Sequence, residues 1–224
     1  MVPPAAHAVR LDGPLVLAHR AGNDLAALRA AEALGVDVIE ADVHLFRGRL
    51  EVRHLKTVGP VRIYWDRWRL CGPGAPIIDL ETLLQAAAPT TRLMLDLKGF
   101  HPRLGSALLA ALERHPDVQV TLCSRHWRHL AAFEGRPNVR LVRSVGNRAQ
   151  LRAVRRLLSH RPLDGISIHR RLLTPAVVSE LRARVPLVLS WPVNSSDAAE
   201  LLAGWGVNGL ISDHPQLLGA GAGS

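Results

Sequence analysis

Cysteines, aromatic residues and long apolar runs are all scarce in this chain of 224 residues. Its two cysteines, Cys71 and Cys123, are too few for a disulfide framework and lack metal-ligand spacing, so we expect reduced thiols with a packing role. No apolar run approaches the roughly 20 residues that a membrane-spanning helix needs. The N-terminus also lacks a positively charged opening followed by an apolar core. These absences favour a cytoplasmic protein.

Phe, Trp and Tyr make up only 4% of the residues and are not interleaved with the basic ones, although the formal net charge is +9. Few aromatic side chains are therefore available to stack on nucleic acid bases, and we expect no nucleic acid binding. Many arginines are scattered along predicted helices such as 148–158, which is typical of a solvated face. The charge favours anionic small molecules such as phosphate esters and allows weak association with an anionic membrane surface, but it indicates no particular oligomeric state.

Short runs rich in Val, Leu and Ile recur along the chain and are apolar nearly throughout instead of alternating with polar residues. This pattern is typical of strands that are covered on both faces, as in a parallel sheet. The predicted strands are 14–20, 36–43, 92–98, 117–124, 139–145, 164–169, 185–193 and 208–213. The segments between them have helical spacing and are rich in Ala, Leu and Arg: 24–35, 79–87, 102–115, 125–135, 148–158, 174–184 and 196–206.

The alternation of strands and helices predicts an α/β fold, a TIM (β/α)8 barrel, with an open doubly wound sheet as the competing arrangement. The length suits a single domain, which we place at 1–218, followed by a disordered tail at 219–224. One segment, 44–74, breaks the alternation. It holds a turn at Gly48 and a short strand, and we predict a loop and hairpin insertion after the second strand.

Two carboxylates interrupt the apolar run 36–43. Glu40 and Asp42 are two positions apart, so they project from one face of the strand, where burial is costly unless a cation or hydrogen bonds compensate them. Asp96 ends another strand at the edge where such barrels gather catalytic groups. Three oxygen donors predict a divalent cation, Mg²⁺ or Ca²⁺. The alternatives are salt bridges to nearby arginines and, for Asp96, a simple pair with Lys98 on the same strand face.

Basic side chains accompany the predicted carboxylate cluster. His19 and Arg20 follow the first strand, and His54 ends the short strand of the insertion. Imidazole titrates near neutral pH, so His19 and His54 could act as general base and general acid, unless they are hydrogen-bonded core residues. Arg20 and Lys98 add fixed positive charge suited to phosphate oxygens. Together these groups predict metal-assisted cleavage of a phosphodiester.

Ordered motifs over nearly the whole chain carry a resemblance to a known family. They are "AHRAGNDLAALRAAEALGVDVIEADVHLFRGRLEVRH", "PIIDLETLL", "LDLK", "LSWPVN" and "GVNGLISDHP". The set resembles the glycerophosphodiester phosphodiesterase family. The resemblance implies a TIM-barrel hydrolase that uses a divalent cation to split a glycerophosphodiester into glycerol 3-phosphate and an alcohol. The implied small-molecule partner is a glycerophosphodiester or a lysophospholipid.

The resemblance also implies a role for each matching residue. The implied roles are an acid and base pair at His19 and His54, metal ligands at Glu40, Asp42 and Asp96, phosphate contacts at Arg20 and Lys98, and a pocket wall at Trp191. Three positions depart from the family pattern: Ala21 replaces a Gly, Leu55 replaces an Asp and Asp96 replaces a Glu. These departures leave a second interpretation open, a catalytically weakened family member that serves as a phosphodiester-binding, lipid-binding or regulatory module.

Overall fold

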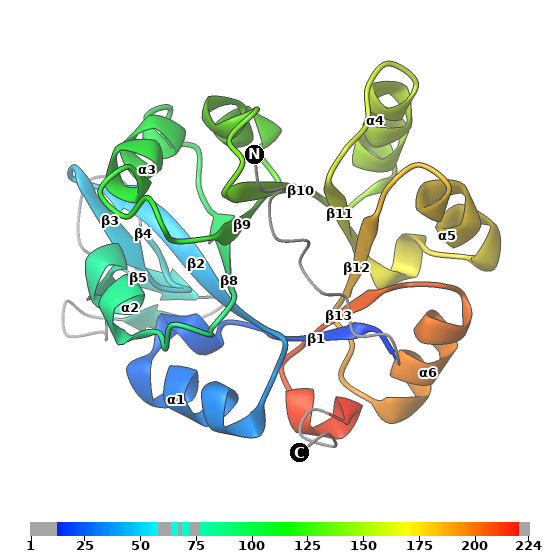
Figure 1. Ribbon diagram of the computed structural model, residues 1–224, viewed down its shortest axis with the longest axis horizontal. Coiled ribbons are helices and arrows are strands. Elements are labelled where there is room, and N and C mark those ends of the chain that lie inside the picture. The colour runs from blue at the N-terminus through cyan, green and yellow to red at the C-terminus, as the bar shows by residue number, and fades with distance from the viewer. Residues whose placement is uncertain (1–12, 58–63, 67–68, 72–76, 220–224) are drawn as a thin grey trace.

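The computed structural model describes residues 13–57, 64–66, 69–71 and 77–219. Eight parallel strands close into a barrel, with helices on the outside (Figure 1). In order around the ring they are β1 (Leu15–Ala18), β2 (Val38–Phe46), β8 (Leu93–Leu97), β9 (Val120–Ser124), β10 (Val139–Val145), β11 (Gly165–His169), β12 (Leu187–Trp191) and β13 (Gly209–Ser212). Because β1 pairs with both β2 and β13, the sheet is closed. The predicted TIM barrel is confirmed, and the open sheet is excluded.

Each predicted helical segment forms a helix. The α-helices are α1 (Leu25–Leu34), α2 (Leu80–Ala86), α3 (Leu104–Leu112), α4 (Arg148–Leu158), α5 (Pro175–Arg182) and α6 (Ser196–Gly204). Short 3-10 helices are η1 (Ala21–Asn23), η2 (Trp127–Phe133), η3 (Arg170–Leu172) and η4 (Pro215–Leu218). The segment 125–135 thus forms a 3-10 helix, η2, and no α-helix. Within the described ranges, no helix has both the length and the apolar character needed to cross a membrane.

Local sequence signals set the ends of these helices. The Asp24 side chain accepts hydrogen bonds from the backbone N–H groups of Ala26 and Ala27 and so caps α1. Gly35 ends that helix with a φ of 70°, a left-handed conformation that glycine adopts without a steric penalty. At α5 the Thr174 side chain accepts from a backbone N–H in the first turn. These caps direct each helix back along the outside of the barrel.

The second barrel strand continues beyond the wall into an antiparallel hairpin. β3 (Arg49–Val52) pairs with the end of β2 and also with β7 (Ile78–Asp79), and the predicted hairpin is confirmed. A separate antiparallel sheet contains β4 (Lys56–Thr57), β5 (Tyr64–Asp66) and β6 (Arg69–Cys71). Parts of the predicted insertion at 58–63, 67–68 and 72–74, and the predicted tail at 220–224, lie outside the described residues. The domain boundary at 218 stays a prediction.

The Glu32 carboxylate links α1 to the loop that follows α2. Glu32 on α1 accepts hydrogen bonds from the Ala88 backbone N–H at 2.9 Å, from Thr91 Oγ1 at 2.6 Å and from Arg29 at 2.8 Å. Burial acts to raise the pKa of Glu32, but these hydrogen bonds outweigh it and lower the pKa below its usual value. The charged carboxylate therefore stabilises the fold.

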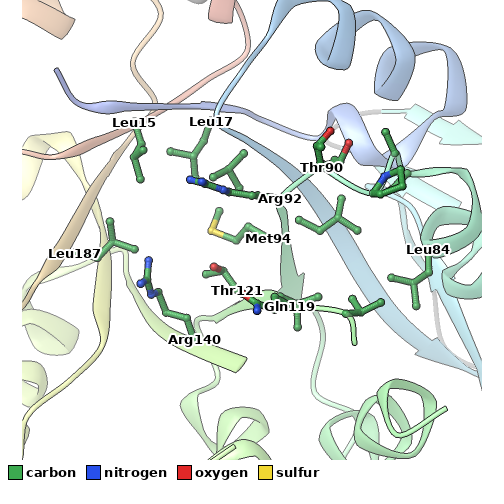
Figure 2. Close-up of a pocket in the computed structure, with 18 of the residues that line it drawn as sticks. Leu15, Leu17, Leu84, Thr90, Arg92, Met94, Gln119, Thr121, Arg140 and Leu187 are labelled. Atoms are coloured by element: carbon green, nitrogen blue, oxygen red, sulfur yellow. The ribbon is translucent and has the colours of Figure 1, made fainter. Parts of the chain in front are cut away.

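The described residues form a cavity at each end of the barrel. The cavity at the amino ends of the strands has a volume of about 720 Å³ and is lined by apolar side chains and by Arg92 and Arg140, with Met94 between them (Figure 2). The second cavity, of about 780 Å³, opens at the carboxyl ends and is lined by His19 and Asp96 among others. Catalytic groups of such barrels lie at the carboxyl ends of the strands. The second cavity is therefore the candidate active site.

Candidate active site

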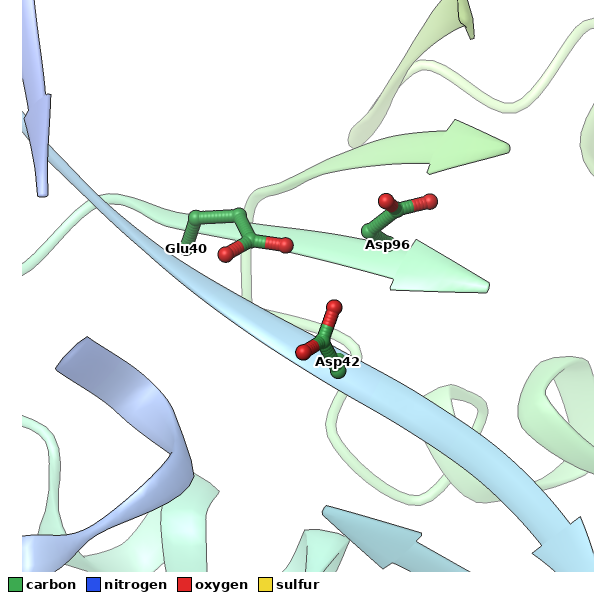
Figure 3. Close-up of side chains that lie close together, drawn as sticks. All are labelled: Glu40, Asp42 and Asp96. Atoms are coloured by element: carbon green, nitrogen blue, oxygen red, sulfur yellow. The ribbon is translucent and has the colours of Figure 1, made fainter. Parts of the chain in front are cut away.

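Three acidic side chains converge over the carboxyl ends of β2 and β8 (Figure 3). The parallel pairing sets Asp42 opposite Asp96, and Glu40 precedes Asp42 by two positions on the same strand face. One oxygen from each carboxylate lies within 4.8 Å of the others. Glu40 and Asp42 are only 2% and 0% exposed. The structure therefore brings the three predicted metal ligands together in a buried acidic cluster.

Asp42 is the best-compensated member of this acidic cluster. Its Oδ2 accepts a hydrogen bond from Asn23 Nδ2 at 3.0 Å, and Asn23 Oδ1 accepts one from the Asp42 backbone N–H at 2.7 Å. His54 Nδ1 lies 3.1 Å from the same Oδ2, and Lys98 Nζ lies 2.9 Å from Oδ1. Burial acts to raise the pKa of Asp42, but Lys98, His54 and Asn23 together hold it well below its usual range. Asp42 therefore stays charged.

Glu40 and Asp96 are compensated less well. Burial and the neighbouring Asp42 charge raise the pKa of Glu40, although the Arg20 backbone N–H donates to its Oε2 at 2.7 Å. Burial, together with Asp42, also raises the pKa of Asp96 against the opposing effect of Lys98. Within the described part of the chain, Asp96 Oδ1 is buried without a hydrogen-bond partner, whereas Asp42 Oδ1 contacts the Lys98 ammonium at 2.9 Å. Buried oxygens with open lone pairs are suited to a hard divalent cation, so the donor set fits Mg²⁺ or Ca²⁺.

Lys98 supplies an internal cation to the acidic cluster. Its ammonium contacts both Asp42 and Asp96, so the predicted pair with Asp96 forms but is shared. Burial acts to lower the pKa of Lys98, but the acidic neighbours outweigh it and raise the pKa. Arg20 contributes less to the cluster, because its Nε lies 3.7 Å from Asp42 Oδ2. The predicted ion pairs therefore form within the acidic cluster, and they leave Asp96 Oδ1 without a hydrogen-bond partner among the described residues.

The turn after β1 places His19 and Arg20 beside the acidic cluster. Arg20 has a φ of 59°, a left-handed conformation that costs a residue other than glycine about 1–2 kcal/mol. This conformation directs the Arg20 backbone N–H to Glu40. Gly22 in η1 allows close packing on β2, because a Cβ at this position would lie 2.7 Å from the Ala41 Cβ. The strained turn is thus held by contacts with the strand that carries the acids.

His19 is oriented by a carboxylate from the last strand. Its Nδ1 lies 2.6 Å from Asp213 Oδ1, and its Nε2 lies 4.0 Å from Glu40 Oε2. Burial and the Arg20 charge lower the pKa of His19, against the opposing effect of Asp213. A neutral imidazole held in this way carries its proton on Nδ1 and presents the Nε2 lone pair to the acidic cluster.

Asp213 and Asn194 also belong to this site, although no role was predicted for them from the sequence. Asp213 directly follows β13, and Asn194 donates from Nδ2 to Asp213 Oδ2 at 2.9 Å. Both residues lie in the motifs that carried the family resemblance, and Asp213 follows a barrel strand as the other polar groups do. That position at a strand end was the signal that could have found Asp213.

Seven of the eight predicted site residues line the cavity at the carboxyl ends, and the eighth, Asp42, is buried in the acidic cluster. His54 reaches Asp42 from the end of the hairpin. Trp191 ends β12, and its ring lies 4.7 Å from the ring of His169, measured between centroids. The Arg125 guanidinium carbon lies 4.8 Å from the Trp191 ring centroid. Basic and aromatic side chains therefore surround the acidic cluster.

Comparisons with known proteins agree with this arrangement. No profile of a known protein family matches the chain. A probable glycerophosphodiester phosphodiesterase 2 from Mycobacterium tuberculosis is 28% identical over 257 aligned residues, which cover 96% of this chain and 93% of the relative.

Two solved structures share the fold at low sequence identity. A phosphodiesterase from Oleispira antarctica, in complex with the product sn-glycerol-3-phosphate, is 20% identical with a TM-score of 0.74, covering 95% of this chain and 98% of that one. A glycerophosphodiester phosphodiesterase from Thermotoga maritima is 17% identical with a TM-score of 0.70, covering 91% of this chain and 96% of that one. By fold and by sequence over nearly its full length, the chain is related to phosphoric diester hydrolases. Its predicted resemblance to the glycerophosphodiester phosphodiesterase family is confirmed.

Proposed function

We propose that this protein is a metal-dependent hydrolase that converts a glycerophosphodiester into glycerol 3-phosphate and an alcohol, or a lysophospholipid into acyl-glycerol 3-phosphate and an alcohol. The observation that carries the proposal is the convergence of the acidic cluster and His19 in one cavity. His19 points its Nε2 toward that cluster, at 4.0 Å from Glu40. The relative from Mycobacterium tuberculosis, similar over nearly its full length, supports the same reaction class. The cytoplasmic location, the lack of nucleic acid binding and the weak membrane association stay predictions.

Glu40, Asp42 and Asp96 would hold the cation, Mg²⁺ or Ca²⁺. The buried Oδ1 atom of Asp96, which has no hydrogen-bond partner among the described residues, supports this assignment. When bound, the cation would polarise the phosphate and offset its negative charge. Arg20 and Lys98 would orient the phosphate oxygens, and Trp191 would form a wall of the pocket.

Two histidines would move the protons. His19 is the general base in this proposal, because its lowered pKa leaves Nε2 unprotonated at neutral pH. It would take the proton of the attacking hydroxyl, from water or from the glycerol of the substrate, as the new bond to phosphorus forms. Attack by the glycerol hydroxyl would give a cyclic phosphate, which a water would then open to glycerol 3-phosphate. His54 would give a proton to the alcohol oxygen as its bond to phosphorus breaks. Asp213 would keep His19 in the productive tautomer through the contact at Nδ1.

The test is the release of glycerol 3-phosphate from a panel of glycerophosphodiesters, followed with a coupled dehydrogenase assay, and the release of the alcohol from a lysophospholipid. We expect turnover in Mg²⁺ or Ca²⁺ that a chelator removes and that His19→Ala and Glu40→Ala abolish. Glu200→Gln, an exposed change on α6, is the matched control and should keep wild-type rates. If no diester yields glycerol 3-phosphate under any of these conditions, the proposal is wrong.

A second candidate function is a diester-binding or regulatory module with weakened chemistry. Lys98 favours it, because an ammonium that already contacts Asp42 and Asp96 compensates part of the acidic cluster without a metal. Ala21, Leu55 and Asp96 are the departures that motivated it from the sequence. Calorimetry that detects diester binding without turnover would establish this function in place of the first.

A further inference from the structure

Outside the acidic cluster, the described wall of the active-site cavity carries basic groups and no carboxylate. The side chains with ionisable nitrogen that line it are His19, Arg20, His44, His54, Lys98, Arg125 and His126. An organic group with a fixed positive charge would therefore meet the guanidinium groups of Arg20 and Arg125 along this wall, and no counter-ion outside the acidic cluster. A hydroxyl or a carboxylate would find hydrogen-bond donors instead.

Two aromatic side chains line this wall, and each already contacts another side chain. The Phe100 ring lies 4.2 Å from the His126 ring, measured between centroids, and Trp191 contacts a cation of the chain itself. Trp191 is the most electron-rich type of ring for holding a quaternary ammonium group. However, the Arg125 guanidinium carbon lies 4.8 Å from the Trp191 ring centroid, and the His169 ring meets the same indole at 4.7 Å with an interplanar angle of 69°. A trimethylammonium group would have to displace Arg125 to reach that contact.

Arg125 is held in this place by its neighbours. It directly follows β9, and Gln150 Nε2 donates to its backbone carbonyl at 3.4 Å. Gly146, after β10, gives the guanidinium room, because a Cβ at this position would lie 3.1 Å from the Arg125 Cζ. No carboxylate among the described residues forms an ion pair with Arg125, and the side chain is exposed at the cavity mouth. Its charge is therefore available to a ligand.

We propose that the pocket selects diesters whose alcohol is neutral or anionic, and that Arg125 is the residue that sets this preference against cationic alcohols such as choline. This inference rests on the proposed function and deepens it by naming the substrate class. An anionic alcohol gains charge-assisted hydrogen bonds from the Arg125 guanidinium, and a polyol gains neutral ones. A cationic alcohol meets repulsion and an occupied Trp191 face.

The test uses three diesters of glycerol 3-phosphate whose alcohols differ in charge: glycolate, ethylene glycol and choline. Dissociation constants are measured by calorimetry, and turnover is measured by release of glycerol 3-phosphate. We expect the wild type to favour the glycolate diester over the choline diester by about tenfold in both measurements, the scale of one charge-assisted hydrogen bond. Because Arg125 is exposed, the ratio should shrink in 0.5 M salt, a chosen condition of roughly 4–5 Å screening length.

Variants separate charge from packing. Arg125→Gln should reduce the glycolate-to-choline ratio to about twofold, and Arg125→Lys, which keeps the charge, should retain most of it. Arg152→Gln removes the same charge from an exposed position on α4 and should leave the ratio unchanged. Circular dichroism and melting curves check that each variant is folded.

Equal affinity of the wild type for all three diesters would overturn the inference, as would an unchanged ratio in Arg125→Gln. Absence of binding for all three would count against both the inference and the proposed function. Discrimination in binding without any turnover would refute the hydrolase and leave the charge preference standing. Equal turnover of all three diesters would support the hydrolase and refute the charge preference.

Discussion

A divalent cation should raise the melting temperature of this protein, and Glu40→Gln or Asp96→Asn should abolish the rise. The three carboxylates have oxygens within 4.8 Å of one another, and Lys98 is the cation among the described side chains that contacts two of them. Burial and the neighbouring Asp42 charge raise the pKa of Glu40, which means that its charged form is costly without further compensation. A bound cation would supply that compensation in the folded state alone.

The size of the rise follows from mass action. At a free cation concentration of about 100 times the dissociation constant, binding to the folded state stabilises it by about 2.7 kcal/mol. For a chain of roughly this length, 1 kcal/mol moves the melting temperature by about 2–4 °C. The expected rise is therefore about 5–10 °C. Differential scanning fluorimetry with titrated Mg²⁺ or Ca²⁺, against a chelator at constant ionic strength, measures it.

The variants make this measurement specific to the acidic cluster. In the cation-free protein at pH 8, Glu40→Gln should melt at the wild-type temperature or above it, because it removes a costly buried charge. Glu32→Gln is the matched control outside the cluster and should keep the full rise in cation. The reasoning is refuted if neither ion raises the melting temperature of the wild type, or if Glu40→Gln and Asp96→Asn show the same rise as the wild type.

Three further predictions concern residues around the site. Asp213→Asn should lower kcat by about 10- to 100-fold and shift the pH–rate profile with little change in KM, because Asp213 orients His19; an unchanged kcat would contradict this. Glu32→Gln should cost about 1–2 kcal/mol in urea unfolding at pH 7. Because folding lowers the Glu32 pKa, the stabilisation by Glu32 is present at a pH above its ordinary pKa of 4.5 and is lost as the pH falls below that value. An equal cost of Glu32→Gln at pH 3 and pH 7 would contradict this prediction. Gly22→Ala should lower the free energy of unfolding by about 1–3 kcal/mol, because the new Cβ would lie 2.7 Å from a β2 side chain. Gly204→Ala is the control, because its Cβ would meet no heavy atom within 4 Å, and it should be neutral or stabilising in the same thermal melts.

The barrel and the acidic cluster were predictable because both depend on short-range patterns. Strands covered on both faces must be apolar throughout, so runs such as 36–43 and 92–98 stood out in the sequence. Asp96 lies near the carboxyl end of β8, and Glu40 and Asp42 lie just before the part of β2 that continues into the hairpin, so parallel pairing brings all three to one edge. The pairing of Asp42 with Asp96 follows from these two facts and from the adjacency of β2 and β8 in the sheet.

The remaining site residues depend on long-range contacts that one sequence does not reveal. Asp213 acquires its role only through the closure of the barrel, which sets β13 beside β1. Arg125 begins the segment 125–135, which we predicted as one more helix. Its contact with Trp191 depends on the order of strands between β9 and β12. The change of that segment to a 3-10 helix was not visible in its composition.

The contact of His19 with Asp213 joins residues 194 positions apart, directly after the first and last barrel strands. The acids of β2 and β8 lie in the first half of the sequence and are synthesised long before β13. The imidazole has no partner to orient it until β13 has emerged and closed the ring. A nascent chain would therefore acquire its cation-binding groups early and its proton-transfer geometry last, so that cleavage of diesters waits for the final strand.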